Sequence, residues 1–164
     1  MKIKIVSICL VGMLAFTSCS KWIDVKPNDR LSEEMLFNDR QGFLKALNGI
    51  YVELTNASIY GDRMSVSALD VLAQYYYITS STHYYYYYTM FNYTDEWIKE
   101  GFDNMWKKTY ELIINTNVLI GKCGESNPVL SEPYFGLVKG EALALRAMLH
   151  LDMLRLFGPI WTEE

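Results

Sequence analysis

The stretch from Gly140 to Pro159 constrains the fold of this chain more than any other part of the sequence. It predicts one long helix with an abrupt end, because Gly158 suits the position after a helix end and Pro159 cannot continue a helix. Apolar residues recur at helical spacing on one face, namely Leu143, Ala147, Leu151 and Leu154. Small residues lie among them, so a neighbouring helix can come close. We therefore expect the inner helix of a helical assembly.

A second long helix is predicted from about Glu96 to Lys122, with Thr94 or Asp95 as its N-cap. The residues expected on its inner face are Ile98, Phe102, Met105, Trp106, Tyr110, Ile113, Asn117 and Ile120. A turn at residues 124–128 follows, and the sequence from Ser131 to Pro133 is typical of a helix start. The two long helices are therefore predicted to form an antiparallel pair joined by a short loop.

Three polar side chains of this pair are expected to need partners. Asn117 falls on an apolar stripe, so we expect it to bond to a backbone carbonyl or to a neighbouring helix. Glu141 and Arg146 do not face each other along their own helix, so each is expected to find its partner on another helix.

Shorter elements are predicted in the first half of the chain. A short helix is expected near residues 32–37, and a longer helix follows from an N-cap at Asn38, with Gln41 completing a capping box. The apolar stripe of this longer helix consists of Phe43, Leu44, Leu47, Ile50, Tyr51 and Leu54. After a turn-rich break, residues 64–73 predict another short helix.

Tyrosine is concentrated between residues 75 and 88 to a degree that is unusual for a protein core. The segment contains Tyr75, Tyr76, Tyr77, Tyr84, Tyr85, Tyr86, Tyr87 and Tyr88. Each hydroxyl would need a hydrogen-bond partner if it were buried. The Ser/Thr-rich spacer and the β-forming tyrosines argue against a regular helix, so we expect a loop or short irregular strands.

Two interpretations of these tyrosines are open. In the first they form a carbohydrate-stacking platform, because an aromatic ring packs on the apolar face of a pyranose and a tyrosine hydroxyl bonds to sugar hydroxyls. In the second they form a packing surface against further chain or against a partner protein, since tyrosine is enriched at such interfaces too. The sequence does not single out any one of the eight tyrosines as a contact.

The N-terminus predicts export and a lipid anchor. A basic start is followed by an apolar run over residues 5–16, which has the length of a signal peptide and is too short to span a bilayer. The sequence Phe16-Thr17-Ser18-Cys19 resembles a bacterial lipobox. We expect a signal peptide over residues 1–18, attachment of acyl chains such as palmitate to Cys19, and a lipidated tether over residues 19–31. The alternative is a plain secretory signal whose cysteine falls there by chance.

Composition and charge exclude several classes of protein. The 164 residues are enough for one domain with a sizeable core, and a hydrophobic content of 51% argues against disorder. The net charge of −4, without a basic patch, gives no support to nucleic-acid binding. The three cysteines form neither a disulfide nor a zinc pattern, and after processing Cys123 alone would remain as a thiol.

No catalytic or phosphate-binding motif is found in the sequence. His83 and His150 are the only histidines, and together with Asp152 or Glu141 they could form a metal site. Their spacing gives no ligand pattern, so we expect His150 to be a helix residue packed at an interface. We expect no metal, no cofactor and no enzymatic activity.

Three parts of the chain resemble the SusD/RagB family, the outer-membrane nutrient-binding lipoproteins of Bacteroidetes-type bacteria. The signature helix of that family is similar to residues 140–159, and its first long helix is similar to Ala46-Leu47-Asn48-Gly49-Ile50-Tyr51. A further family helix has the pattern W-x-x-x-Y-x-x-I-x-x-x-N, which is matched here by Trp106, Tyr110, Ile113 and Asn117.

This resemblance implies an all-α fold of tetratricopeptide-like antiparallel helix pairs over residues 32–164. Family members are several times longer, so the chain is expected to be a truncated N-terminal portion with uncovered apolar helix faces. Glycan-binding members place part of an aromatic arc between their first long helix and the next one. The tyrosine segment of this chain lies at that place.

The expected function is therefore that of a non-enzymatic glycan- or nutrient-binding lipoprotein of the bacterial outer membrane. The resemblance implies a lipid-anchored protein at the cell surface that captures an oligosaccharide and delivers it to a TonB-dependent SusC-like transporter. The alternative is a helical-repeat scaffold lipoprotein that binds other proteins. A lipoprotein hydrolase is disfavoured, because the sequence offers no catalytic constellation.

Overall fold

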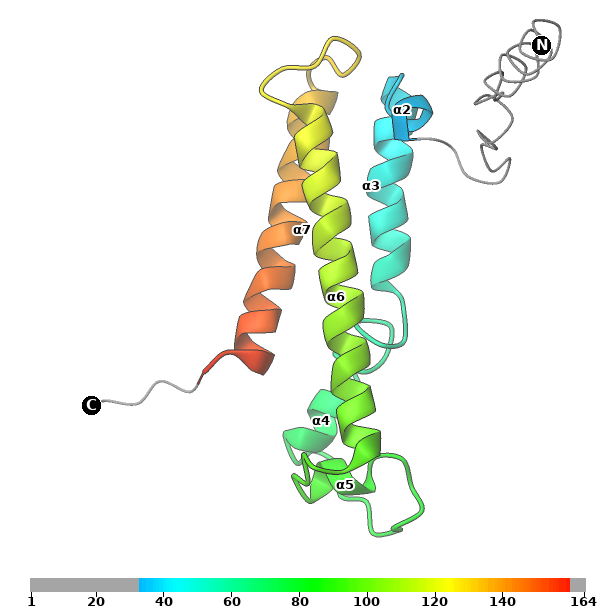
Figure 1. Ribbon diagram of the computed structural model, residues 1–164, viewed down its shortest axis with the longest axis vertical. Helices are drawn as coiled ribbons and strands as arrows, with labels where there is room; N and C mark the ends of the chain where they lie inside the picture. Colours follow the sequence, from blue (N-terminus) through cyan, green and yellow to red (C-terminus); the bar gives the residue numbers. More distant parts are fainter. Residues whose placement is uncertain (1–32, 160–164) are drawn as a thin grey trace, which may run out of the picture. The chain divides into compact units, whose positions relative to one another are not determined.

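The computed structural model describes residues 33–159 of the chain. All regular secondary structure in this part is helical, which confirms the prediction of an all-α fold. The helices in order are α2 (Glu33–Leu36), α3 (Arg40–Leu54), α4 (Ala68–Leu72), α5 (Tyr86–Thr89), α6 (Glu96–Cys123) and α7 (Tyr134–Phe157). The long helices α3, α6 and α7 lie side by side, and α4 and α5 gather at the N-terminal end of α6 (Figure 1).

Helices α6 and α7 form the predicted antiparallel pair (Figure 1). The Asp95 side chain caps α6 by accepting a hydrogen bond from the backbone nitrogen of Trp97 at 2.9 Å, which confirms one of the two predicted caps. Gly124 follows the last turn with a φ of 63°, a left-handed conformation that suits glycine. Residues 124–133 then lead back into α7. The repetition of such pairs in a tetratricopeptide-like array stays a prediction.

The cap of α3 lies one residue later than predicted. Asp39 has an extended backbone, and its side chain accepts a hydrogen bond from the backbone nitrogen of Gly42 at 2.7 Å, so the prediction of Asn38 is wrong. Both residue types suit an N-cap, and the sequence does not distinguish them. Gly42 also lies against the Leu36 carbonyl, where any Cβ atom would overlap. Glycine therefore allows α2 to approach the first turn of α3.

Helix α7 packs through the face opposite to the one predicted to be inside. Its buried side chains are Val138, Ala142, Leu145, Leu149 and Met153. The predicted inner residues do share a face, but Leu143, Leu151 and Leu154 are 38%, 55% and 64% exposed. The expectation that this face is turned inward is therefore wrong for the described chain. Apolar residues occur on every side of α7, so their spacing alone does not identify the packed side.

Two hydrogen bonds between side chains link α7 to the long helices α3 and α6. The Tyr51 hydroxyl of α3 donates to Glu141 Oε2 at 2.8 Å, and Arg146 donates to Asn117 Oδ1 of α6 at 2.9 Å. These bonds confirm that Glu141, Arg146 and Asn117 find partners on neighbouring helices. They also fix the rotation of α7 about its axis, because both charged residues flank its buried face.

The core lies between the three long helices. Fully or almost fully buried side chains from α3 and α6 are Phe43, Leu47, Ile50, Ile98, Met105, Leu112, Ile113 and Leu119. Cys123 closes the core at the end of α6 as a free, buried thiol. Burial raises the pKa of this thiol, so its reactive thiolate form is disfavoured.

Helix α5 sits on α6 through the contact between Tyr88 and Gly101. The Tyr88 side chain is fully buried, and its ring packs against those of Tyr85 and Phe102 at centroid distances of 5.3 and 6.1 Å. A Cβ atom at position 101 would overlap the Tyr88 hydroxyl. Glycine at this position therefore lets the tyrosine segment dock on the long helix.

The Leu149→Ala substitution is expected to lower the free energy of unfolding by about 2–5 kcal/mol, because it leaves a cavity in place of a fully buried side chain. The Leu151→Ala substitution removes the same atoms from a side chain that is 55% exposed, and is expected to cost less than about 1 kcal/mol. Urea unfolding followed by circular dichroism measures both values. Equal losses at the two positions would contradict the described orientation of α7.

The Gly101→Ala substitution is expected to destabilise the protein, although alanine is the better helix former. Overpacking against Tyr88 costs about 1–3 kcal/mol, whereas helix propensity returns at most about 1 kcal/mol. Gly121→Ala is the matched control on the same helix, because a Cβ atom there meets nothing within 4 Å and should stabilise the protein. Thermal unfolding measures both variants, and a Gly101→Ala protein that melts above the parent would refute the contact.

Candidate functional site

The tyrosine segment lies between α4 and α6, at the N-terminal end of α6 (Figure 1). Within residues 73–95 the chain forms turns and the single short helix α5, with no strand. Most of the segment is therefore the predicted loop rather than irregular strands, but Tyr86, Tyr87 and Tyr88 lie in α5, where the expectation against a helix is wrong. The eight predicted tyrosines fall into two groups with different surroundings, one before and one after the Ser/Thr-rich spacer.

The first group, Tyr75, Tyr76 and Tyr77, is exposed to solvent at 78%, 57% and 71% of the side-chain surface. Gln74 precedes them with a φ of 62° and turns the chain away from α4. Its side-chain amide donates to the Thr89 carbonyl at 3.5 Å, which links the start of the segment to α5. Among the described residues, none of the three rings packs on another aromatic ring and none of their hydroxyls is hydrogen-bonded.

The second group, Tyr84 to Tyr88, packs into an aromatic cluster. The Tyr84 ring stacks on that of Trp97 at 6.1 Å with an interplanar angle of 17°, and meets the Tyr85 ring edge-on at 5.0 Å. Tyr87 meets both Trp97 and Tyr86 edge-on, at 6.3 and 5.3 Å. We call Tyr84 to Tyr88 together with Trp97 the aromatic cluster.

Hydrogen bonds engage two hydroxyls of the aromatic cluster. Arg63 donates to the Tyr84 hydroxyl at 3.0 Å, and its guanidinium lies 5.5 Å from the centre of the same ring. The Tyr85 hydroxyl lies 2.8 Å from Ser67 Oγ and donates to Asp62 Oδ2 at 3.4 Å. The loop before α4 therefore holds these two tyrosines in place.

Tyr88 differs from the other tyrosines of this group because its side chain is fully buried against α6. Burial, followed by the nearby hydroxyl of Tyr84, raises the pKa of its phenol well above the ordinary value. A neutral, fully enclosed ring of this kind packs the segment onto α6 and offers no surface to a ligand.

Trp97 is a candidate that sequence reasoning missed. Its side chain is 42% exposed although its ring contacts Tyr84 and Tyr87, so it extends the aromatic surface of the segment onto the first turn of α6. The signal in the sequence was an aromatic residue two positions after the helix cap, next to a tyrosine-rich loop. The spacing of apolar residues in α6 gave it no role, because Trp97 lies off the buried face.

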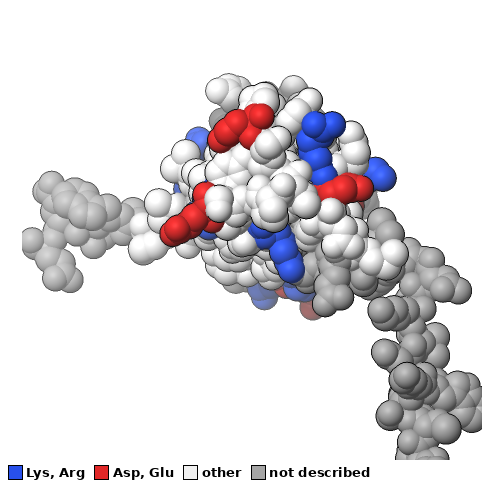
Figure 2. Space-filling view, turned by 90° about the horizontal axis from the view of Figure 1, so that it is seen from above, with Lys and Arg blue, Asp and Glu red and all other residues white. Residues whose placement is uncertain are grey.

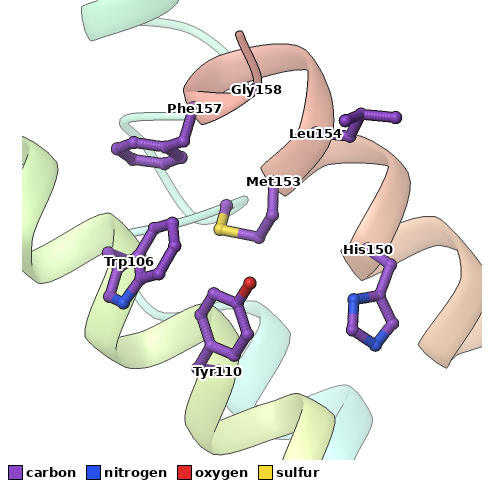
Figure 3. Close-up of a pocket in the computed structure, with 7 residues that line it drawn as sticks. All are labelled: Trp106, Tyr110, His150, Met153, Leu154, Phe157 and Gly158. Atoms are coloured by element: carbon purple, nitrogen blue, oxygen red, sulfur yellow. The ribbon is translucent and has the colours of Figure 1, made fainter.

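A separate aromatic hollow of about 260 Å³ lies between α6 and α7 (Figure 3). It is lined by Trp106, Tyr110, His150, Met153, Leu154, Phe157 and Gly158. The Trp106 ring is held edge-on by Phe157 at 5.0 Å and packs at a tilt against Tyr110 at 4.5 Å. The exposed His150 lies beside this hollow, edge-on to Tyr110 at 6.4 Å.

A second hollow, of about 410 Å³, is lined by Met64, Leu69, Asp152, Arg155 and Leu156. Its two charged groups are already engaged, because Arg155 lies 3.4 Å from Asp152 Oδ1 and the Tyr60 hydroxyl donates to Asp152 Oδ2 at 2.5 Å. Burial and this hydrogen bond together raise the pKa of Tyr60 above its ordinary value. The hydrogen bond between Tyr60 and Asp152 therefore anchors the loop before α4 to α7.

Charged side chains give no indication of a metal or polyanion site in the part of the chain described. Over residues 33–159, no group of three or more His, Cys, Asp or Glu side chains is placed to hold a metal ion. Figure 2 looks onto one end of the molecule, where acidic and basic side chains are scattered among uncharged ones. Neither sign forms a continuous patch on that face.

The predicted lipidation residue, Cys19, lies outside the described residues, as do the predicted signal peptide and tether. No helix within residues 33–159 is both long enough and apolar enough to cross a bilayer.

Comparison with known proteins places the whole described region in one family. Residues 21–164 match a SusD-like family described as "Starch-binding associating with outer membrane". The chain is 24% identical over 170 aligned residues to "SusD-like protein P25" of Formosa agariphila, and the alignment covers 99% of the chain and 32% of that protein. The chain thus spans about a third of the length of this curated relative. No solved structure matches it.

The family match includes the two long helices, the tyrosine segment and both hollows. It confirms the family resemblance predicted from three segments of the sequence. These segments are the signature helix, the first long helix and the helix that contains Trp106. The chain belongs to the SusD-like family, whose members are described as starch-binding and associated with the outer membrane.

Proposed function

We propose that this chain is part of a glycan-binding lipoprotein of the bacterial outer membrane, with no catalytic activity of its own. It captures an oligosaccharide with aromatic side chains of the tyrosine segment and delivers it to a TonB-dependent SusC-like transporter. Acyl chains on Cys19 hold the protein in the membrane, at the cell surface. The family description supports the glycan and the outer membrane.

The exposed tyrosines carry this proposal. Neighbouring aromatic side chains that are open to water form a patch of the kind that often marks an interaction site, and Tyr75, Tyr76 and Tyr77 are each more than half exposed. Their rings are free to stack on the apolar face of a pyranose. Their hydroxyls have no hydrogen-bond partner within residues 33–159 and are therefore available to sugar hydroxyls. Trp97 offers a further partly exposed ring on the adjacent turn of α6.

The anchoring part of the proposal depends on the N-terminal sequence. An apolar run of signal-peptide length ends in Thr17-Ser18-Cys19, and an outer-membrane family requires export of this kind. Several acyl chains on one cysteine anchor a protein far more firmly than a single chain does.

A second candidate function is a helical scaffold that binds other proteins. The exposed leucines of α7 favour it, because an uncovered apolar helix face is a common docking surface. The two functions differ in their ligands. A protein that co-purifies with an outer-membrane transporter and binds no glycan across a broad array would support the scaffold.

Changing Tyr75, Tyr76 and Tyr77 together to alanine is expected to weaken starch binding by about tenfold or more, through loss of stacking and of hydroxyl contacts. Native affinity electrophoresis in gels containing starch measures the retardation of each variant. Val52→Ala is the control, because Val52 is 67% exposed on α3 outside the segment. Unchanged retardation of the triple variant would exclude these tyrosines from the binding surface.

The Cys19→Ala substitution is expected to abolish incorporation of a palmitate analogue and to release the protein from the membrane fraction. Metabolic labelling in a Bacteroidetes host, followed by membrane flotation, measures both effects. Cys9→Ala is the matched control, because that cysteine lies within the predicted signal peptide and should leave labelling intact. Labelling that persists in Cys19→Ala would rule out this cysteine as the anchor.

A further inference from the structure

The tyrosine segment combines wide exposure to solvent with an absence of charged residues. Between Asp70 and Asp95 the sequence contains no Asp, Glu, Lys or Arg. Exposed positions of a protein surface are usually rich in these four residues. Here the large exposed side chains are instead Tyr75, Tyr76, Tyr77, Met90, Phe91 and Tyr93. A ligand of this surface therefore meets rings and hydroxyls but no cationic group from the segment itself.

His83, the one histidine of the segment, adds no positive charge in this geometry. Its Nδ1 atom accepts a hydrogen bond from the backbone nitrogen of Tyr85 at 3.1 Å. An imidazole nitrogen that accepts a hydrogen bond carries no proton, so the ring is neutral.

Arg63 is the nearest cation in the loop before α4, and the fold already engages it. Its guanidinium donates to the Tyr84 hydroxyl at 3.0 Å and to the Gly101 carbonyl at 3.4 Å, and it lies over the Tyr84 ring. The side chain is also partly buried. Its donors therefore hold the aromatic cluster in place rather than facing a ligand.

The N-terminal end of α6 is occupied as well. Free backbone N–H groups at the start of a helix attract anions. Here the Asp95 carboxylate accepts the hydrogen bond of the Trp97 backbone nitrogen at 2.9 Å, and Glu96 places a second carboxylate in the first turn. An anionic ligand would have to displace one carboxylate and approach another.

Acidic side chains lie beside the exposed ring of Trp97. Glu96 precedes it, and Glu100 lies one turn further along α6, so both share its region of the helix surface and both are exposed. Lys99 is the one basic residue of these turns. It lies three residues from Glu96 and four from Asp103, so carboxylates on its own face of the helix offset its charge. The surroundings of Trp97 are therefore negative.

These features specify the charge of the ligand. A uronate or sulfate group is bound through charge-assisted hydrogen bonds from Arg, Lys or a helix N-terminus, and it loses its hydration at a high cost where none is offered. An uncharged pyranose needs only rings and hydroxyls. We infer that the tyrosine segment accepts uncharged glycans and excludes glycans that carry uronate or sulfate groups. This selectivity rests on the proposed glycan binding and adds to it the charge class of the ligand.

Glu96 and Glu100 are the specificity-determining residues in this arrangement. A binding surface discriminates by penalising the wrong ligand as well as by contacting the right one. Carboxylates beside the aromatic rings repel an acidic sugar, whereas an uncharged sugar bound on the rings feels no such repulsion. Changing their charge should therefore alter the binding of acidic glycans alone.

Matched glycan pairs test the charge selection. Amylose and its C6-oxidised derivative share one backbone and differ in the carboxylate that replaces each hydroxymethyl group. Galactan and sulfated galactan form a second pair. Isothermal titration calorimetry with the 164-residue chain measures the dissociation constants at low salt. In each pair that is bound, we expect the acidic member to bind about tenfold or more weakly than the neutral one.

A charge-reversed variant tests the role of Glu100. Glu100→Lys is expected to tighten binding of the acidic glycan by about fivefold or more at low salt, and the gain should disappear at about 0.5 M NaCl. Binding of the neutral glycan should stay unchanged, which also shows that the fold is intact. Glu125→Lys is the matched control, because it changes the net charge equally at an exposed position beyond the other end of α6.

The possible failures are distinguishable. An acidic glycan that binds as tightly as its neutral counterpart would overturn the charge selection and leave glycan binding in place. A chain that binds no member of either pair would refute the proposed function, and the selection with it. Equal gains in Glu100→Lys and Glu125→Lys would overturn the role of Glu100, because net charge rather than a position beside Trp97 would then exclude acidic glycans.

Discussion

The rotation of α7 about its own axis determines most of what surrounds it, and polar contacts fix that rotation. Apolar residues lie on all sides of the helix, so burial of apolar surface alone would be satisfied by more than one orientation. Glu141 bonds to Tyr51 of α3, Arg146 bonds to Asn117 of α6, and Asp152 bonds to Tyr60 of the loop before α4. Three different elements therefore hold the same side of α7, as single polar residues do when they set helix register.

This orientation also positions the candidate binding surface. Tyr60 and the residues after it form the loop that contains Asp62, Arg63 and Ser67, and these side chains hold Tyr84 and Tyr85. From the other side, Gly101 of α6 admits the buried ring of Tyr88. The second half of the tyrosine segment is thus fixed by packing, which leaves the first half free to face solvent.

Local sequence signals predicted the helices well, because caps and breakers act within a few residues. Asp95 and Gly158 mark the start of α6 and the end of α7, whereas the cap predicted at Asn38 lies at Asp39, because both residue types suit a cap. The buried face of α7 could not be predicted, since the rows through Leu149 and through Leu151 are both apolar. Partners far apart in the chain decided between them. Among the tyrosines, no sequence signal distinguishes the buried Tyr88 from the exposed Tyr76, because identical residues differ only in the contacts that the fold brings to them.

Two exposed surfaces of the described residues differ in their chemistry, namely the tyrosines before the spacer and the leucines of α7. The exposed tyrosines combine a ring with a hydroxyl, so they suit a ligand that is itself partly polar and arrives from water. The face of α7 that carries Leu143, Leu151 and Leu154 exposes side chains without hydroxyls, which suit a dry contact with another apolar surface. A sugar offers the leucines of that face little apolar surface to pack on. A tightly packed helix, in turn, would leave the tyrosine hydroxyls without the hydrogen bonds that they can make. The segment between α4 and α6 therefore has the chemistry of a ligand surface, whereas the exposed leucines of α7 have the chemistry of a packing surface.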